Sequence, residues 1–357
     1  MTRIAAALFA FGALAIGASF PQSAVGELVS THLEDRGLDI FPAELKLGYS
    51  VSAQIHSRKH ACKDGRRDKL YFRHGKKRTL KDIGRSSDHG AVSLTGLARR
   101  RPDSLILRAQ RKRIERQGRD FTCSSANLRR FPRAATVRFE FTPNTVPEND
   151  FSAGALDLLL RTGATHDTRT SRIEFGFDDD FRFATDAVPT CNPDDLVGQI
   201  DMAEAMGRCG SAKVGTGTGE GALGTAIFNG CVLVFNGAPS DDGWPTILLF
   251  IRADPSPPTI DCSNPGSNHN GHYTVLWQGS LGYAPDGSGY GRVLDLRHLA
   301  RPVQITDLNL TLGNGDYVSA RCDSQDALEG WQLRTQLSYL KPRSVQTMHS
   351  IQPCVAG

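Results

Sequence analysis

Apolar and polar residues alternate without interruption from Leu45 to Ile55, which predicts a half-buried β-strand. Further short apolar runs follow at intervals of roughly 8 to 15 residues, and turn residues such as Asp64-Gly65 and His74-Gly75 separate them. This spacing is typical of a small antiparallel sandwich of the seven-stranded type, which we place at residues 41–130. The basic segment Arg111–Arg119 has no apolar stripe and is predicted to be a solvated hairpin.

The second part of the chain, residues 134–357, also has the period of strands, as at Val137, Phe139 and Phe141. Two runs, 231–235 and 247–251, are apolar at every position and should be covered on both faces. One helix is expected at Asp201–Met206, with Asp201 as its N-cap. We therefore predict an all-β protein whose larger unit is an antiparallel sandwich or jelly roll with one short helix.

Residues 1–26 have the features of a signal peptide, because Arg3 precedes an apolar segment and a small-residue exit. An uncleaved anchor is the alternative, although the apolar segment is short for a membrane span. Signal cleavage would leave no stable span. We therefore expect a secreted or extracellular, envelope-associated protein of 357 residues before cleavage.

The eight cysteines all follow the predicted signal peptide, and an even number in an exported chain favours disulfide bonds. No Cys-x-x-Cys spacing occurs, which argues against a zinc ribbon or a thioredoxin-like redox site. Counting alone leaves many pairings open. Our hypothesis is the sequential one, namely Cys62 with Cys123, Cys191 with Cys209, Cys231 with Cys262, and Cys322 with Cys354.

The small unit resembles the carboxypeptidase-regulatory-like, or transthyretin-like, β-sandwich repeats of secreted bacterial proteins. The resemblance rests on Ser57, Cys62-Lys63-Asp64-Gly65-Arg66, Leu70-Tyr71-Phe72, Gly75, Ile83-Gly84, Asp88-x-Gly90-x-Val92, and Cys123 before Ser125. Where those repeats carry a Gly-x-Tyr-Tyr-Ala strand, this chain has the different segment 103–109. The resemblance implies a stalk or spacer module and not an enzyme.

The larger unit looks like a second exported bacterial family with no assigned activity. The segments that carry this resemblance are Phe177–Phe181, Cys209–Gly215, Phe235–Gly237, Val293–Asp295 and Tyr317–Cys322. It implies export and a compact domain, and it transfers no catalytic residue.

The acidic triplet Asp178, Asp179 and Asp180 is the candidate metal site. If the preceding strand continued, Asp179 would point towards the core and would need a partner such as Ca²⁺, which prefers carboxylate and carbonyl oxygens. The alternative is a bend or strand end at the triplet, with Asp179 capping backbone N–H groups or pairing with an arginine. Asp178 and Asp180 also have the separation of an acid/base pair, but any two acidic residues two apart on a strand share it.

Other catalytic motifs are absent from the sequence. Gly219, Gly221 and Gly224 fit a Gly-x-Gly-x-x-Gly pattern, but the chain continues as a strand and we interpret them as hairpin glycines. Gly-x-Ser-x-Gly and His-Glu-x-x-His do not occur. We therefore assign no catalytic residue and no cofactor, apart from the Ca²⁺ considered for the triplet.

Charge is divided unevenly along the chain. Lys46 to Arg133 holds 25 Lys and Arg against 7 Asp and Glu, while the remainder holds 17 basic and 31 acidic residues of the totals of 42 and 38. The expected polyanion contacts are the clustered basic residues Arg66, Arg67, Lys76, Lys77, Arg78, Arg99, Arg100, Arg101, Arg111, Lys112 and Arg113. The alternatives are a solvated face or docking of these residues against the acidic unit. The sequence shows no recognition helix for sequence-specific nucleic-acid binding.

These observations favour an exported, non-enzymatic surface protein that binds an anionic polysaccharide or envelope polymer through its basic unit. A secreted polysaccharide hydrolase with carboxylates near Asp178–Asp180 is one alternative function. A structural spacer without a ligand is the other.

Overall fold

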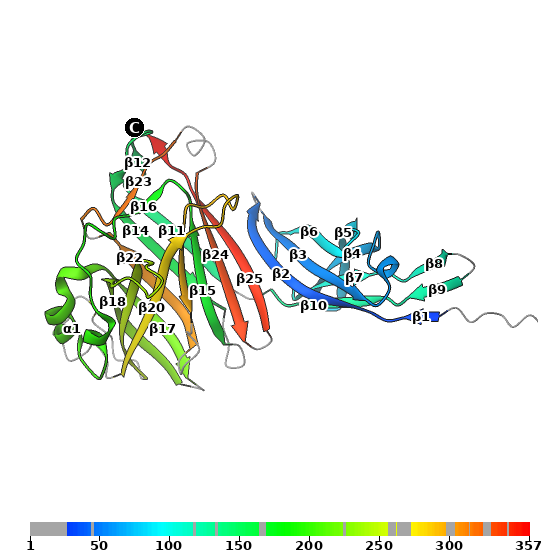
Figure 1. Cartoon of the computed structure of the whole chain (residues 1–357), viewed down its shortest axis with the longest axis horizontal. Coiled ribbons are helices and arrows are strands. Elements are labelled where there is room, and N and C mark those ends of the chain that lie inside the picture. Colours follow the sequence, from blue (N-terminus) through cyan, green and yellow to red (C-terminus); the bar gives the residue numbers. More distant parts are fainter. Residues whose placement is uncertain are drawn as a thin grey trace, which may run out of the picture.

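The computed structural model describes residues 27–43, 46–116, 119–132, 135–163, 169–223, 226–255, 262, 273–297, 304–313, 315–323, 330–340 and 343–357. The predicted signal peptide, residues 1–26, lies outside the described residues. The described chain is nearly all β with a single short α-helix, which confirms the predicted fold class. No helix in these ranges is long and apolar enough to cross a membrane. A small unit, which contains the strands up to β10, lies beside a larger one (Figure 1).

The small unit is a sandwich of seven strands in two sheets. One sheet contains β2 (Thr31–Ala43), β3 (Lys46–Ser57) and β6 (Ala91–Ala98). The other has the order β10 (Ala126–Arg130), β7 (Ser104–Ala109), β4 (Arg67–His74) and β5 (Lys77–Arg85). Tyr49 and Val51 from the first sheet pack against Leu70, Phe72 and Leu107 from the second. Burial of alternate residues on each strand thus produces the core that the alternation predicted.

A third sheet extends the small unit away from the larger one. It consists of β1 (Glu27–Val29), β9 (Arg119–Cys123) and β8 (Lys112–Arg116). Strands β8 and β9 form the predicted basic hairpin. Both β1 and β2 begin before residue 41, so the described strands of the small unit start at Glu27, earlier than the boundary that we expected.

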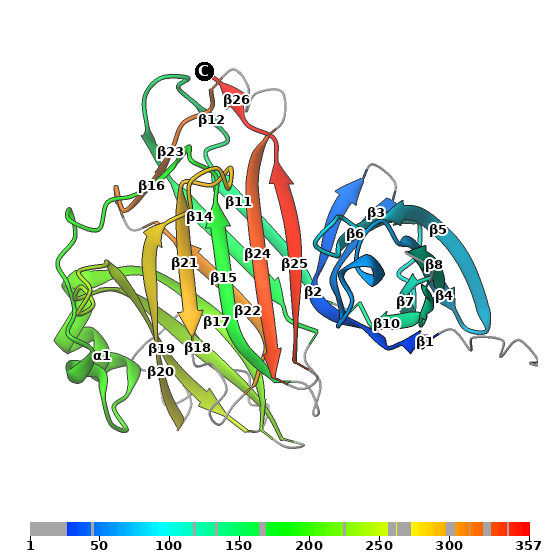
Figure 2. The ribbon, with the colours of Figure 1, turned by 45° about the vertical axis from the view of Figure 1, so that its right-hand side comes forward.

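The larger unit is built on one continuous sheet that curls until its first and last strands meet, and we call it the rolled sheet (Figure 2). Its strands have the order β11 (Thr136–Thr142), β14 (Ala155–Arg161), β22 (Gln304–Leu312), β17 (Lys213–Leu223), β18 (Ala226–Gly237), β19 (Thr246–Asp254), β20 (Tyr273–Tyr283), β21 (Arg292–Arg297), β15 (Thr170–Phe177), β24 (Trp331–Leu340) and β25 (Arg343–Gln352). Opposite halves of the rolled sheet pack on one apolar core.

Short strands extend this architecture at one end of the rolled sheet. They are β12 (Thr145–Val146) paired with β26 (Val355–Ala356), and β13 (Ser152–Ala153), β23 (Val318–Ala320) and β16 (Phe181–Phe183) in a second small sheet. The rings of Phe141, Phe181 and Trp331 pack edge to face beneath them. This end of the rolled sheet is therefore filled by aromatic side chains.

A glutamine side chain joins the first and last strands of the rolled sheet. Strands β11 and β25 lie against each other. The Gln352 side chain accepts a hydrogen bond from the Phe141 N–H at 2.6 Å, and its Nε2 donates to the Phe141 carbonyl at 2.9 Å. A side-chain amide thus replaces the two bonds that a neighbouring backbone would supply.

Strand β2 joins the two units. It pairs with β3 along its length, and three of its residues, Leu38 to Ile40, also pair in parallel with Gln346 to Met348 of β25. An ion pair between Arg130 and Asp35 lies next to this contact, and Arg130 also donates to the Val345 carbonyl. The small sandwich therefore continues the sheet of the larger unit (Figure 2).

The two runs that are apolar at every position are buried on both faces, as predicted. Val232 and Leu249 belong to the core inside the rolled sheet, whereas Leu233, Leu248 and Phe250 face outwards into a second cluster. Helix α1 (Met202–Cys209) covers that outer cluster. As predicted, Asp201 caps the helix, because its side chain accepts a hydrogen bond from the Glu204 N–H at 2.7 Å.

The four disulfide bonds are those of the sequential hypothesis. They join Cys62 with Cys123, Cys191 with Cys209, Cys231 with Cys262, and Cys322 with Cys354. Cys191–Cys209 fastens the end of α1 to the chain segment before the helix. Four bonds within one chain indicate folding in an oxidising compartment.

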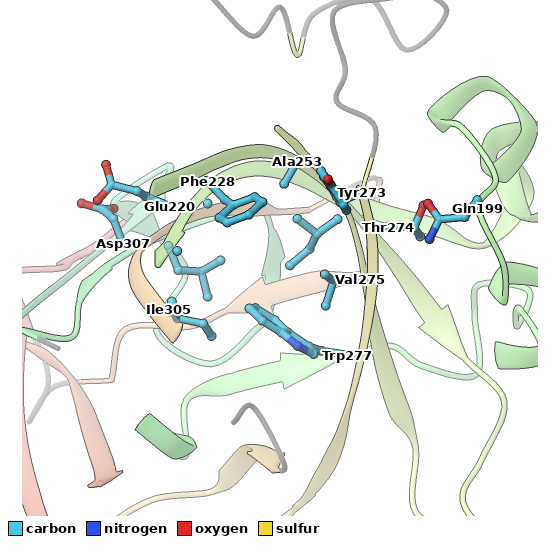
Figure 3. Close-up of a pocket in the computed structure, with 14 residues that line it drawn as sticks. Gln199, Glu220, Phe228, Ala253, Tyr273, Thr274, Val275, Trp277, Ile305 and Asp307 are labelled. Carbon is cyan, nitrogen blue, oxygen red and sulfur yellow. The ribbon is translucent and has the colours of Figure 1, made fainter. Parts of the chain in front are cut away.

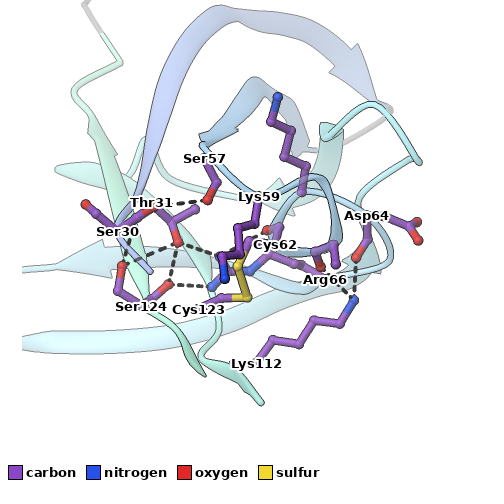
Figure 4. The surroundings of a disulfide bond; sticks show 12 residues. Ser30, Thr31, Ser57, Lys59, Cys62, Asp64, Arg66, Lys112, Cys123 and Ser124 are labelled. Carbon is purple, nitrogen blue, oxygen red and sulfur yellow. Dashed lines mark hydrogen bonds between the residues drawn. A yellow bond between two sulfur atoms is a disulfide. The ribbon is translucent and has the colours of Figure 1, made fainter. Parts of the chain in front are cut away.

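Arg66, which we expected to contact a polyanion, is fully buried instead. Beside the Cys62–Cys123 bond its guanidinium donates to the Thr31 hydroxyl at 3.0 Å and to the carbonyls of Cys62, Gln110 and Ser124 (Figure 4). These bonds satisfy the charged group with backbone acceptors from several segments. Arg66 therefore holds several segments of the small unit together by internal hydrogen bonds, and it cannot reach a surface ligand.

Asp68 is buried in the same interior. Burial raises the pKa of its carboxyl group to about 7, and the positive charge of Arg66 opposes this rise. A carboxyl group that holds its proton more tightly in the folded state than in the unfolded state makes folding less favourable as the pH rises.

We predict that Gln352→Ala lowers the free energy of unfolding by about 1–3 kcal/mol, because the N–H and C=O of Phe141 lose their partner. Denaturant unfolding would measure the change. Gln336→Ala, on the neighbouring strand β24, is the control, because that side chain makes no hydrogen bond to the described residues. Equal stability of the two variants would contradict the role of Gln352.

We predict that the stability of the wild-type protein relative to Asp68→Asn falls between about pH 4 and pH 7, on the order of 2 kcal/mol. Below this window Asp68 is neutral in both states. Above it the wild type carries a buried carboxylate, whereas the asparagine stays neutral. Urea unfolding of both proteins at several pH values tests this, with exposed Asp64→Asn as the control. A pH-independent difference between Asp68→Asn and the wild type would refute the prediction.

Candidate functional site

The outer surface of the four-stranded sheet of the small unit carries a concentration of positive charge. Inward side chains such as Leu70 and Leu107 are buried, so the alternate residues of each strand face outwards. We call this surface the basic face. Its cationic residues are Arg67, Lys69 and Arg73 on β4, Arg78 and Arg85 on β5, Arg108 on β7, and Arg129 on β10.

Like charges stand directly opposite each other on the basic face. Arg67 is paired with Arg85 and Arg73 with Arg78 across β4 and β5, and Lys69 is paired with Arg108 across β4 and β7. Directly opposed like charges destabilise an antiparallel sheet. Among the described residues, none of the seven cations forms an ion pair with a carboxylate. The arrangement therefore costs folding energy that an external anion would offset.

Apolar side chains lie between the cations. Tyr71 is at the centre of β4, opposite Leu80 and Ile106, and the Arg78 guanidinium lies 5.5 Å from the centre of its ring. Leu80 and Ile83 are each 42% exposed. Cations and partly exposed apolar side chains therefore alternate on the basic face.

The basic face is directed away from the larger unit. Strand β2, which pairs with β25, belongs to the opposite sheet of the sandwich. Figure 2 shows β5 on the side of the small unit that is remote from β25. The basic face is therefore not used for docking against the acidic unit of the same chain.

The structure separates the predicted basic residues into distinct groups. Arg67 and Arg78 lie on the basic face, and Lys76 and Lys77 are exposed at the tip of the β4–β5 hairpin beside it. Arg99, Arg100 and Arg101 are exposed in the turn before β7. That turn leads to Asp103, which accepts a hydrogen bond from Gly75 N–H and so brings the turn close to the hairpin tip.

The three basic residues of the β7–β8 region lie elsewhere. Arg111 is exposed, but Lys112 donates to the carbonyls of Ala61 and Asp64, and Arg113 pairs with Asp120 at 2.7 Å. Lys112 and Arg113 are thus engaged within the protein.

Lys69, Arg73, Arg85 and Arg108 of the basic face were missed by the sequence analysis, because none of them has Lys or Arg as a neighbour in the chain. The analysis selected clusters of adjacent basic residues, but neighbouring residues on a strand point to opposite faces. The informative signal is the alternation Arg67-x-Lys69-x-Tyr71-x-Arg73 on a strand. It places three cations and a ring on one surface.

The aspartate triplet is a turn and not a continuation of the strand. Strand β15 ends at Phe177, so Asp178 and Asp180 are buried while Asp179 is exposed, opposite to the expected orientation. Asp178 accepts a hydrogen bond from Gln332 N–H at 3.0 Å, and Asp180 pairs with Arg321. The triplet is thus at a strand end, as in the alternative that we considered, but Asp178 and Asp180 make the contacts that we had expected of Asp179.

The chemistry of the triplet is dominated by these internal contacts. Burial, followed by the hydrogen bond with Asp179, raises the pKa of Asp178 to about 7. Within the described ranges, no group of three or more His, Cys, Asp or Glu side chains is placed to hold a metal ion. The triplet therefore orients the turn between β15 and β16.

Comparison with models of known protein families and with curated proteins found no match to this chain. The two family resemblances inferred from the sequence therefore stay predictions.

Proposed function

We propose that this chain is an exported, non-enzymatic binding protein whose basic face contacts an anionic polymer of the cell envelope. The observation that carries the proposal is the set of seven outward cations on β10, β7, β4 and β5, which have no carboxylate partner among the described residues. Such a surface binds polyanions by releasing their counterions.

The geometry of the basic face favours a linear polymer over a small anion. The cations are spread over four strands that lie roughly 5 Å apart, and no single point gathers them. Tyr71, Leu80 and Ile83 supply apolar contact between the charges. An acidic polysaccharide offers repeated carboxylates and sugar rings that fit this arrangement.

The compartment is consistent with this proposal. The four disulfide bonds indicate an oxidising environment. Outside the cytoplasm the abundant polyanions are envelope polymers, so a basic face there would hold the protein at the cell envelope.

We predict that Lys69→Ser combined with Arg108→Ser weakens binding to polygalacturonate about tenfold at roughly 50 mM salt. The plot of log Kd against log salt concentration should lose a slope of about two, because two cations no longer displace counterions. Isothermal titration calorimetry of the oxidised full chain at several salt concentrations would measure both quantities.

The control is Arg111→Ser combined with Arg113→Ser, which removes the same charge from the small unit but leaves the basic face intact. This variant should bind within about twofold of the wild type. Loss of affinity to the same extent in both variants would show that net charge and not the basic face is responsible. Absence of binding by the wild type at low salt would refute the proposed function.

A further inference from the structure

The rolled sheet encloses an apolar cavity of about 360 Å³ at the end away from the aromatic cluster around Trp331. Its walls come from the inner faces of β18, β19, β20 and β22, and include Phe228, Ile251, Val275, Trp277 and Ile305 (Figure 3). The volume and the apolar lining are those of a small-molecule site. An apolar cavity of roughly 150 Å³ can hold one benzene molecule, so this one has space for a larger group.

The absence of a side chain at Gly219 leaves space for this cavity. On β17 the inward position Gly219 faces Leu308 of β22, and no side chain extends from it into the space. A Cβ atom at Gly219 would have its closest contacts at 3.8 Å, which is ordinary van der Waals distance. At Gly217, by contrast, a Cβ atom would lie 2.1 Å from the Asn309 carbonyl oxygen. Gly217 is thus required by packing, whereas Gly219 leaves space open.

The charged residues next to the cavity face away from it. Glu220 and Asp307 are the only charged residues among the described ones beside it, and they follow the inward pair Gly219 and Leu308 on β17 and β22, so their side chains lie on the outer face of the sheet (Figure 3). Asp307 pairs with Arg161 at 2.9 Å, and Glu220 accepts a hydrogen bond from the Thr306 hydroxyl. The exposed side chains of Tyr273 and Gln199 complete the lining on other sides. Among the described residues, no charged side chain therefore faces the interior of the cavity.

We propose that this cavity binds the alkyl chain of a small amphiphile, whose head group remains in water at the mouth. The chain buries its methylene groups against the aliphatic and aromatic walls, which supplies most of the binding free energy. Because the head group stays in water, the length and fit of the alkyl chain determine the affinity. This site lies in the larger unit and is independent of the basic face.

The test is isothermal titration calorimetry of the oxidised full chain with dodecyltrimethylammonium, dodecanol and dodecanoate, each below its aggregation limit. We expect all three compounds to bind with affinities within about tenfold of one another, because they share the same alkyl chain. No binding of any of the three would overturn the proposal, and binding of only one of them would show that the head group and not the alkyl chain is recognised.

A cavity-filling variant locates the site. Gly219→Leu should reduce the affinity for dodecyltrimethylammonium by at least about tenfold, because the new side chain occupies the space of the alkyl chain. Gly282→Leu, on β20 away from the cavity, is the matched control, since a Cβ atom there meets only Trp244 at 3.8 Å. Unchanged binding by folded Gly219→Leu would overturn the proposed site.

A spectroscopic measurement keeps the test valid if Gly219→Leu fails to fold. Trp277 lines the cavity, whereas Trp331 lies in the aromatic cluster and Trp244 is on the surface. Binding should therefore change the tryptophan emission of the wild type, and Trp277→Phe should abolish that change. A change that persists in Trp277→Phe would place the ligand elsewhere.

Discussion

The organisation of this protein depends on how the free edge of β25 is covered. A strand edge presents unpaired N–H and C=O groups that recruit other strands. Leu38 to Ile40 of β2 pair with the middle of this edge, and Gln352 connects its end to Phe141 of β11. One strand edge therefore both closes the rolled sheet and attaches the small unit. The orientation of the basic face follows, because β2 belongs to the opposite sheet of the sandwich.

Much of this fold could be predicted from local patterns. Alternation marked the strands, runs that are apolar at every position marked β18 and β19, and an aspartate marked the start of α1. Strand β2 was missed because a bulge between Asp35 and Gly37 shifts its register and interrupts the alternation. The rolled closure also escaped prediction, because a side-chain amide that pairs with a distant strand leaves no periodic signal.

The candidate site was predictable in its charge and not in its geometry. Composition identified the basic unit, but only the pairing of strands shows which cations share a surface. Arg66 illustrates the limit: it is followed directly by Arg67, yet one side chain is buried among carbonyl groups and the other faces solvent. The sequence analysis likewise predicted the wrong orientation for Asp179. It assumed that the strand continues, whereas the strand ends at Phe177 and the Asp179 side chain is exposed. Whether such a side chain is buried or exposed depends on tertiary contacts, which the local sequence does not show.

The pairing of β2 with β25 also constrains the order in which the chain can fold. Nearly the whole chain separates these strands in sequence, so their contact is among the most non-local in the molecule. Domains generally fold as units during synthesis, beginning with the N-terminal one, and non-local pairing is slow. The small sandwich would thus be complete while one edge of β2 still lacks its partner. Until β25 is available, that edge is open to pairing with other chains, which is a route to aggregation.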